Sequence, residues 1–600
     1  MFQRLILFLA AMLISLFPSF LGVKAPSILG VQEAYAADGD EHDEDDDDED
    51  DDDEDDDEDD DDGDEGDEDD ENDEGDEGDE NDEGDEDDDG DEGDEGDEGD
   101  EDDEGDEVDE GDEGNEGGAN SAPWIPLHSV APLVPATADL SGQGFLRVIN
   151  HSPKSGQVQV VPIDDAGQRY PAISLRLDSG EAAHFNSDDL ERGNPNKGIS
   201  GSSGSGQGDW RLELLTELDI EVLSYVRGND GFLTAMHDVV PGTATSHWLP
   251  FFNPASNYNQ RSLLRLINAG TEPVDVTITG VDDHGNSPGG PVRIVVAPDA
   301  AVTLSASDLE DGVGVAGALG DGQGKWRLTV ESSQPIGVMN LLSNPTGHLT
   351  NLSSFPVNER QGTFGVPLFP SAGDADGREG VLRIINRTAQ AGEVRIAALD
   401  ESNWSYDPLR LALPANQAVH LNSHDLEMGN ASKGLLGRTG AGEGDWFLEL
   451  TSDLDIEVLS YVRHWDGFLT SMHDRAPKSG HLAQVAFFNP ASNFNQLSRL
   501  RLVNPGAEAA EVMISGVDDK GVAAESEVRA TIGARNVLTL TAEQLENGIG
   551  VQGALGDRSG KWRLTVESNS RIQVMSLMES PTKHLTNLST SRGAGGADLE

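Results

Sequence analysis

Short runs in which apolar and polar residues alternate recur from residue 123 towards the C-terminal end of the chain, and clusters of Gly, Pro, Asn and Asp separate them. In the run 562–566, Trp562, Leu564 and Val566 share one face, and Arg563 and Thr565 share the other. Alternation with a period of two is typical of a β-strand that buries one face. Because six or seven such strands with turn signals between them follow one another, the pattern predicts an all-β sandwich.

The strand pattern repeats, and the repeat sets the predicted domain boundaries. Residues 251–257 recur at 487–493, 236 positions later, and residues 146–150 match residues 264–268, 118 positions later. A period of this length is a whole domain rather than one unit of a solenoid. The predicted fold class is all-β: four tandem immunoglobulin-like β-sandwich modules after a disordered acidic segment. The predicted modules 1 to 4 span residues 123–242, 243–359, 360–479 and 480–600.

Each predicted module also contains one short element that is not a strand. A Ser, Thr or Asn is followed three positions later by Asp or Gln, and then by Leu and Gly, which approximates a capping box with a glycine stop. The pattern predicts a single helical turn between two strands of each module. The four cap residues are Asn186, Ser305, Asn422 and Thr541.

The N-terminal 36 residues resemble a secretory signal peptide rather than part of the fold. Arg4 precedes an apolar run from Leu5 to Val23, and Ala34-Tyr35-Ala36 matches an A-x-A cleavage site. The alternative is an uncleaved membrane anchor, although Pro18 and Gly22 interrupt the run. The sequence contains no later apolar stretch of about 18 residues, so no membrane span is expected after signal cleavage.

An acidic low-complexity tract at residues 37–122 accounts for most of the net charge of −81. It contains 61 Asp or Glu residues and no Lys or Arg between Asp38 and Asn120. Because such a segment cannot bury apolar surface, it is predicted to be disordered. Its charge would repel nucleic acid and anionic lipid, so neither is an expected partner. Two interpretations stay open: a solubilising spacer, and a segment that binds calcium weakly, with affinity on the order of millimolar.

The absence of cysteine from the 600 residues excludes disulfides, thiolate metal sites and a cysteine nucleophile. Paired acidic residues in predicted hairpin turns are the candidate calcium ligands within the modules. Asp before Gly is also common turn chemistry, so the same residues have a purely structural interpretation. The candidates are Asp164, Asp165, Asp282, Asp283, Asp518 and Asp519.

Repeated histidines suggest an alternative, enzymatic interpretation. His237-Asp238 and His473-Asp474 occupy equivalent positions, and a His-Asp pair can serve a nucleophile. Neighbours on a strand point to opposite faces, however, and no G-x-S-x-G elbow is present, so we expect structural histidines and no catalytic residues. His348 and His584 are likewise equivalent, and no two histidines have the close spacing that would predict zinc.

Tryptophans divide into two groups. Trp210, Trp326, Trp446 and Trp562 begin equivalent strands and are predicted to pack in the cores. Trp465 replaces Asn229 of module 1, so the fold does not require it, and it is the candidate exposed ligand contact.

The module resembles β-sandwich repeats at the ends of bacterial secreted and surface proteins, through residues 500–506, 516–519, 560–566 and 584–588. The acidic tract resembles, by composition, the Asp-rich segments of mineral-associated and calcium-buffering proteins. In such proteins, which include some exported proteases, the module looks like an accessory to a catalytic domain. Because the modules and the acidic tract account for this chain, we expect a non-enzymatic scaffold or adhesion protein that is secreted to the cell surface or periplasm. Its expected partners are divalent cations and extracellular polymer or cell-surface components. The alternatives are a carbohydrate- or polymer-binding module array and a secreted hydrolase.

Overall fold

The computed structural model describes residues 127–139, 142–228, 230–237, 244–353, 362–401, 404–442, 444–472 and 480–589. The predicted signal peptide and acidic tract lie outside these residues, so what was predicted for them stays a prediction. None of the helices in the described ranges has both the length and the apolar character needed to cross a membrane.

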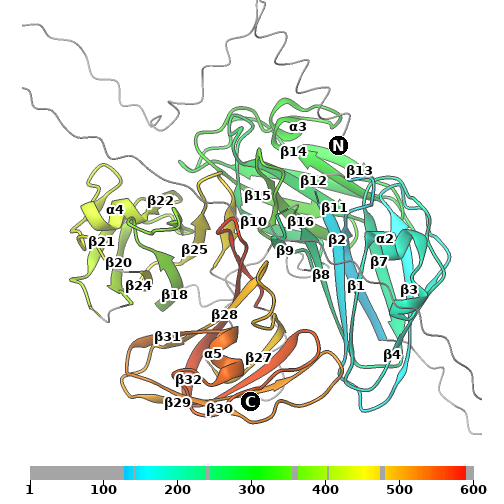
Figure 1. The fold of residues 1–600 in the computed structure, drawn as a ribbon. Coiled ribbons are helices and arrows are strands. Elements are labelled where there is room, and N and C mark those ends of the chain that lie inside the picture. The colour runs from blue at the N-terminus through cyan, green and yellow to red at the C-terminus, as the bar shows by residue number, and fades with distance from the viewer. Residues whose placement is uncertain are drawn as a thin grey trace, which may run out of the picture. The chain divides into compact units, whose positions relative to one another are not determined.

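Modules 1 and 2 each consist of two antiparallel sheets (Figure 1). The sheet orders are β1-β7-β3-β4-β6 and β5-β2-β8-β9 in module 1, and β10-β15-β12-β13 and β14-β11-β16-β17 in module 2. The strands of module 1 are β1 (Leu127–Val134), β2 (Gln143–Asn150), β3 (Gly156–Asp164), β4 (Ile173–Leu177), β5 (Ala182–Asn186), β6 (Ile199–Ser200), β7 (Trp210–Thr216), β8 (Ile220–Arg227) and β9 (Leu233–Ala235). Those of module 2 are β10 (Ser246–Phe252), β11 (Arg261–Ile267), β12 (Val274–Val281), β13 (Val292–Val296), β14 (Ala301–Ser305), β15 (Trp326–Ser332), β16 (Gly337–Ser343) and β17 (Leu349–Asn351).

Modules 3 and 4 repeat this arrangement. Module 3 has the sheets β18-β24-β20-β21-β23 and β22-β19-β25-β26. Its strands are β18 (Gly362–Pro370), β19 (Glu379–Asn386), β20 (Gly392–Leu399), β21 (Leu409–Leu413), β22 (Ala418–Asn422), β23 (Leu435–Leu436), β24 (Asp445–Ser452), β25 (Ile456–Arg463) and β26 (Leu469–Ser471). Those of module 4 are β27 (Gly480–Phe488), β28 (Leu497–Asn504), β29 (Ala510–Val517), β30 (Val528–Ile532), β31 (Asn536–Thr541), β32 (Trp562–Glu579) and β33 (Leu585–Asn587).

One long strand in module 4 replaces two strands of module 2. The first half of β32 pairs with β27 and β29, and its second half pairs with β28. β31 follows β28 in the sheet. In module 2 the corresponding stretch is divided into β15 and β16, and Pro335 stands between them where module 4 has Arg571. Because proline has no N–H to donate to a ladder, it interrupts the pairing in module 2.

Each module has its own apolar core between its two sheets, and a tryptophan lies in each core. Trp210, Trp326, Trp446 and Trp562 are at most 1% exposed, which confirms the core packing that was predicted for them.

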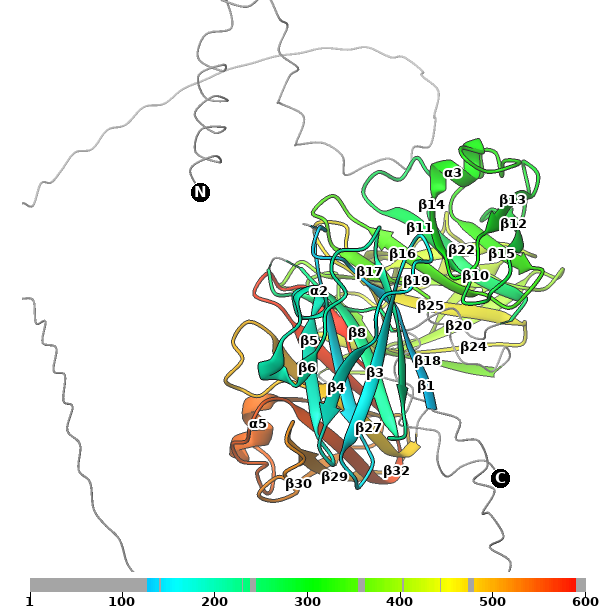
Figure 2. The same ribbon diagram turned by 90° about the vertical axis from the view of Figure 1, so that its right-hand side faces the viewer.

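The predicted helical turns are also confirmed, and each begins with a complete capping box. In three modules a glutamate of this helix accepts a hydrogen bond from the core tryptophan, as Glu310 Oε1 does from Trp326 Nε1 at 2.6 Å. The helix therefore closes the core at one end, and in Figure 2 α2 lies beside β5. The helices are α2 (Ser187–Arg192), α3 (Ala306–Asp311), α4 (Ser423–Met428) and α5 (Ala542–Asn547), and module 1 adds the 3-10 turn η1 (Pro195–Lys197).

The four modules contact one another in a closed cycle. Four further apolar clusters join module 1 to module 2, module 2 to module 3, module 3 to module 4, and module 4 back to module 1. The short strand β9 packs beside β17 and β33, and β26 packs beside the same two strands. The described residues from 127 to 589 therefore belong to one compact unit. Tandem β-sandwich modules were predicted and are confirmed, whereas the closure of the cycle was not predicted.

Candidate functional site

At one equivalent position, each module has an arginine that is at most 1% exposed, although arginine is normally exposed. The four arginines lie 118 residues apart on equivalent strands, and each contacts an acidic residue of the preceding module, module 4 preceding module 1. The pairs are Arg147 with Asp519, Arg265 with Asp165, Arg383 with Asp283 and Arg501 with Glu401. The ion pairs follow the same closed cycle as the apolar clusters.

The contact between modules 1 and 4 shows how such a pair is built. Arg147 Nη1 lies 2.6 Å from Asp519 Oδ1, and Arg147 Nε donates to the carbonyl oxygen of Ala486 at 3.0 Å. His184 Nε2 lies 3.0 Å from Asp519 Oδ2, and burial lowers the pKa of His184 to about 4, so its ring is neutral near pH 7. Burial alone would raise the pKa of Asp519, but His184 and Arg147 hold it well below its usual range. Because a buried charge is stable only when it is paired, this contact fixes one module against the other.

The six aspartates predicted as calcium ligands lie at hairpin turns, and the two members of each pair have different roles. The first accepts backbone N–H groups of its own turn, as Asp164 Oδ1 does from Gln168 at 2.9 Å. The second faces a neighbouring module and contacts one of the buried arginines. Calcium binding at these residues stays a prediction. The first members are Asp164, Asp282 and Asp518, and the second are Asp165, Asp283 and Asp519.

Four equivalent residues, one from each module, meet where β9, β17, β26 and β33 come together; we call Asp230, His348, Asp466 and His584 the junction. His348 Nε2 lies 3.4 Å from Asp230 Oδ1, and its Nδ1 lies 3.5 Å from Asp466 Oδ2. His584 Nε2 lies 3.0 Å from Asp466 Oδ2, and its Nδ1 lies 3.8 Å from Asp230 Oδ2. Aspartate and histidine thus alternate around a ring that ties all four modules together.

Two threonines determine which protonation state fits the junction. Thr346 Oγ1 lies 2.9 Å from His348 Nδ1 and 2.8 Å from Asp466 Oδ2. Thr582 Oγ1 likewise bridges His584 Nδ1 at 2.8 Å and Asp230 Oδ2 at 2.5 Å. A hydroxyl has one hydrogen, and an ionised carboxylate can only accept. Thr346 Oγ1 also lies 2.9 Å from Asn344 Oδ1, so its one hydrogen goes to one of two acceptor oxygens and not to His348 Nδ1. The contacts of His348 are satisfied when its Nδ1–H donates to Thr346 and its Nε2–H donates to Asp230. The geometry fits an imidazolium ring at His348 between the carboxylates of Asp230 and Asp466.

Electrostatics at the junction agree with this arrangement. Burial alone would lower the pKa of His348, but its hydrogen bonds to Asp230 and Asp466 raise that pKa to about 9. Burial alone would raise the pKa of each junction aspartate, but hydrogen bonds from histidine and threonine hold both values well below their usual range. Charged partners that are nearly excluded from water stabilise one another strongly when all hydrogen bonds are made.

The junction also contains the residues that could hold a metal ion. Ligand atoms of Asp230, His348 and His584 lie within 4.8 Å of one another, the only such group among the described residues. Imidazole nitrogen and carboxylate oxygen are ligands that zinc accepts. A metal ion would take one nitrogen from each histidine in place of a proton, so metal and protons would compete for the same site.

Aromatic rings surround the junction and limit its contact with water. The His348 and His584 rings lie 4.6 Å apart, and Phe232 and Phe468 pack edge-on against His348 at 5.6 Å each. His584 is 2% exposed. Of the other residues considered for chemistry, His237 Nδ1 lies 3.2 Å from the backbone oxygen of Ser224, and His473 lies outside the described residues.

Sequence reasoning missed the junction because it looked for histidines close together along the chain. The signal was the alternation at one repeat position: Asp230, His348, Asp466 and His584 follow one another at intervals of 118 residues. In an open row of modules these positions would stay apart, and only the closed cycle brings them together.

The predicted exposure of Trp465 is confirmed at 62%, and its role as a ligand contact stays a prediction.

The fold and the junction define an all-β protein of four tandem β-sandwich repeats. No protein-family model matches the chain, and no curated protein matches it. Among solved structures, the chain is similar to a tetra-tandem repeat in the extending region of a large adhesion protein, with 11% identity over 77% of this chain and 97% of that chain. The TM-score of that match is 0.08, so it does not bear on the arrangement of the modules or on function.

Proposed function

We propose that this chain is an exported, non-enzymatic scaffold or adhesion protein. Its closed set of four modules would carry a polyanionic segment that binds divalent cations weakly and approaches extracellular polymer or cell-surface components. The observation that supports this proposal is the position of the buried charged side chains. Most of the buried ion pairs and histidines join modules to one another, which suits a body that must hold its shape.

The acidic segment would supply the response to cations. Sixty-one carboxylates without a neighbouring base repel one another, and calcium would screen that repulsion and bridge carboxylates of the same or another copy. The modules would serve as the rigid part from which this segment extends. Cell surface or periplasm is the proposed location, in keeping with the predicted signal peptide.

Calorimetric titration with Ca²⁺ tests the proposal. The full chain is compared with a full-length variant in which every Asp and Glu of the acidic tract is replaced by Asn or Gln. We expect binding with a dissociation constant on the order of millimolar in the first and none in the second. Equal heat in both chains would place calcium in the modules, where the paired turn aspartates are the candidates. No heat in either chain would overturn the cation role.

A further inference from the structure

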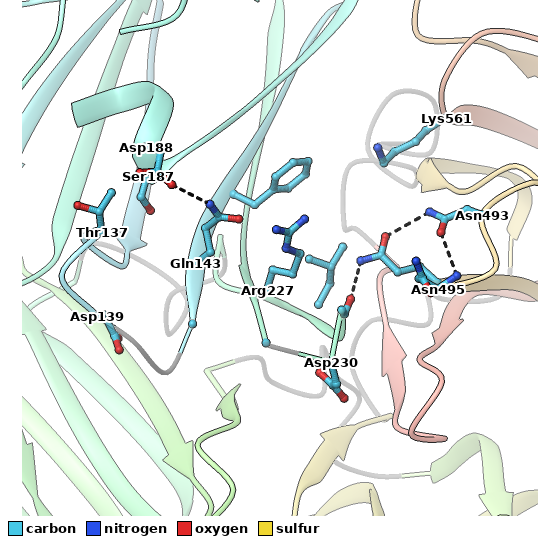
Figure 3. A pocket seen from close by; sticks show the side chains of 16 residues that line it. Thr137, Asp139, Gln143, Ser187, Asp188, Arg227, Asp230, Asn493, Asn495 and Lys561 are labelled. Atoms are coloured by element: carbon cyan, nitrogen blue, oxygen red, sulfur yellow. Dashed lines mark hydrogen bonds between the residues drawn. The ribbon is translucent and has the colours of Figure 1, made fainter. Parts of the chain in front are cut away.

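A cavity of about 840 Å³ lies between modules 1 and 4. Module 1 contributes the start of β2, the end of β8 and the turn at Gly228 and Gly231; module 4 contributes Lys561 and the loop of Asn493 and Asn495 (Figure 3). Gln496 Nε2 donates to the carbonyl oxygen of Gly231 at 2.6 Å and so bridges the two modules at the edge of the cavity.

Arg227, which lines this cavity, lacks the ion-pair partner that the equivalent arginine of module 3 has. In module 3, Arg463 forms an ion pair with Glu379 on the neighbouring strand. In module 1 the equivalent residues are Arg227 and Gln143, paired in the same register. Gln143 Nε2 donates instead to Asp188 at 3.3 Å. Arg227 has no ion pair among the described residues, and Figure 3 shows its guanidinium facing the cavity.

A second cation of this cavity, Lys561, lies against two aromatic rings. Lys561 Nζ lies 5.8 Å from the centre of the Phe145 ring and 5.4 Å from that of Phe487. Within the described ranges, no acceptor is bonded to this ammonium group. Burial, assisted by the charge of Arg147, lowers the pKa of Lys561 to about 8 and outweighs the opposing effect of Asp519.

The carboxylates that line the cavity do not neutralise these two cations. Asp188 lies 3.2 Å from Arg192, and Asp230 belongs to the junction. Asp139 lines the part of the wall away from Lys561, as Figure 3 shows. The remaining polar side chains are the hydroxyls of Thr137 and Ser187 and four amides, and amides both donate to and accept from hydroxyls.

We propose that this cavity binds an acidic saccharide through one of its uronic acid units. Arg227 and Lys561 would hold the carboxylate, because a guanidinium matches it with two parallel hydrogen bonds and an ammonium group adds a point charge. Asn493 and Asn495 would bond the hydroxyls, and the half-buried Phe145 ring would meet the C–H face of the sugar. A concave site with a few convergent polar groups and one aromatic wall is typical of a small-ligand pocket. The inference is independent of the cation role proposed for the acidic tract.

Calorimetric titration of the full chain with a trigalacturonate tests this, with the uncharged trisaccharide maltotriose as the comparison ligand. We expect the acidic ligand to bind at least 10-fold more tightly. Gln143→Glu would give Arg227 the ion-pair partner that Arg463 has and should weaken trigalacturonate binding at least 10-fold. Lys561→Gln should have an effect of similar size.

The equivalent interface between modules 2 and 3 supplies matched controls. Lys325→Gln makes the corresponding change there, whereas Glu379→Gln makes the reverse exchange and frees Arg463. Neither variant should weaken trigalacturonate binding. Because Gln143→Glu also places a carboxylate beside Asp188, the double variant with Asp188→His reproduces the pair found in module 3 and should still bind weakly. Thermal unfolding checks that each variant is folded. Equal affinity for the two trisaccharides, or equal weakening by the control variants, would overturn the proposal.

Discussion

The interface between modules 1 and 4 and the one between modules 2 and 3 are built from the same residues at positions 236 apart, yet only the second joins modules that are consecutive in the chain. Arg147, His184 and Asp519 in the first correspond to Arg383, His420 and Asp283 in the second. The arginine lies 2.6 Å from the aspartate in both, and the histidine Nε2 lies 3.0 Å away in one and 3.1 Å in the other. The same contact therefore closes the cycle without the help of a linker.

The two interfaces differ only away from this contact. Gln143 of module 1 corresponds to Glu379 of module 3, and Gly228 corresponds to His464. His464 is 3% exposed, and its ring lies 4.9 Å from that of His584. The contact of arginine, aspartate and histidine is thus the same in both copies, while Gln143 and Gly228 of the cavity wall have different counterparts. The comparison separates the residues that join the modules in both interfaces from the cavity residues that differ between them.

Removing the shared aspartate should give the largest effect. Asp519→Ala leaves the guanidinium of Arg147, which is 0% exposed, without its partner, and an unpaired buried charge costs about 3–5 kcal/mol. Asp283→Ala should cost a similar amount, because Arg383 is buried to the same extent. Urea unfolding monitored by tryptophan fluorescence measures both, and Asp275→Ala, at an exposed strand position, is the control.

The pair of variants should differ in a second measurement. Loss of the contact between modules 1 and 4 frees modules that are far apart in sequence, whereas modules 2 and 3 stay linked and at a high effective concentration. Small-angle scattering should therefore show expansion for Asp519→Ala and little change for Asp283→Ala. Identical scattering from both variants would mean that the junction and the apolar clusters suffice to keep the cycle closed.

His348 of the junction and the interface histidines His184 and His420 should respond to pH in opposite directions. The folded pKa of His348 is raised to about 9, so its contribution is complete below the unfolded value of about 6.5 and is lost as the pH rises through about 9. The folded pKa values of His184 and His420 are lowered by burial to about 4 and about 3, so their contributions are present above about 6.5 and are lost as the pH falls towards those values.

Stability should therefore be greatest near pH 6.5. For His348 the shift corresponds to about 3 kcal/mol, lost between about pH 6.5 and 9. The free energy of unfolding is measured across pH 4 to 10 for the wild type and for His348→Gln, which keeps a polar side chain but cannot titrate. The variant should lack most of the alkaline loss while retaining the acidic one. An unchanged alkaline slope would contradict the protonated junction.

The fold was largely predictable, because β-strands leave a period-two pattern and each module repeats it. The helical turns were predictable from the cap residues, as at Asn186, since capping is a local interaction. The junction was not, because Asp230 and Asp466 come from modules 1 and 3 and meet the two histidines only through closure of the cycle. Local patterns carry no information about which repeat surfaces meet. Nothing in the run 146–150 distinguishes the buried Arg147 from an exposed polar residue of an alternating strand.

The smallest effect is expected at Trp465, an exposed aromatic residue beside the junction that module 3 has and module 1 lacks. Trp465→Asn introduces the residue that module 1 has at the equivalent position. Because Trp465 is 62% exposed, the free energy of unfolding should change by no more than about 0.5 kcal/mol. If Trp465 contacts a polymer, as its exposure and replaceability suggest, the same variant should lose polymer binding without any shift in unfolding. A loss of stability above about 1 kcal/mol would instead show that its ring, 6.3 Å from that of His584, supports the junction.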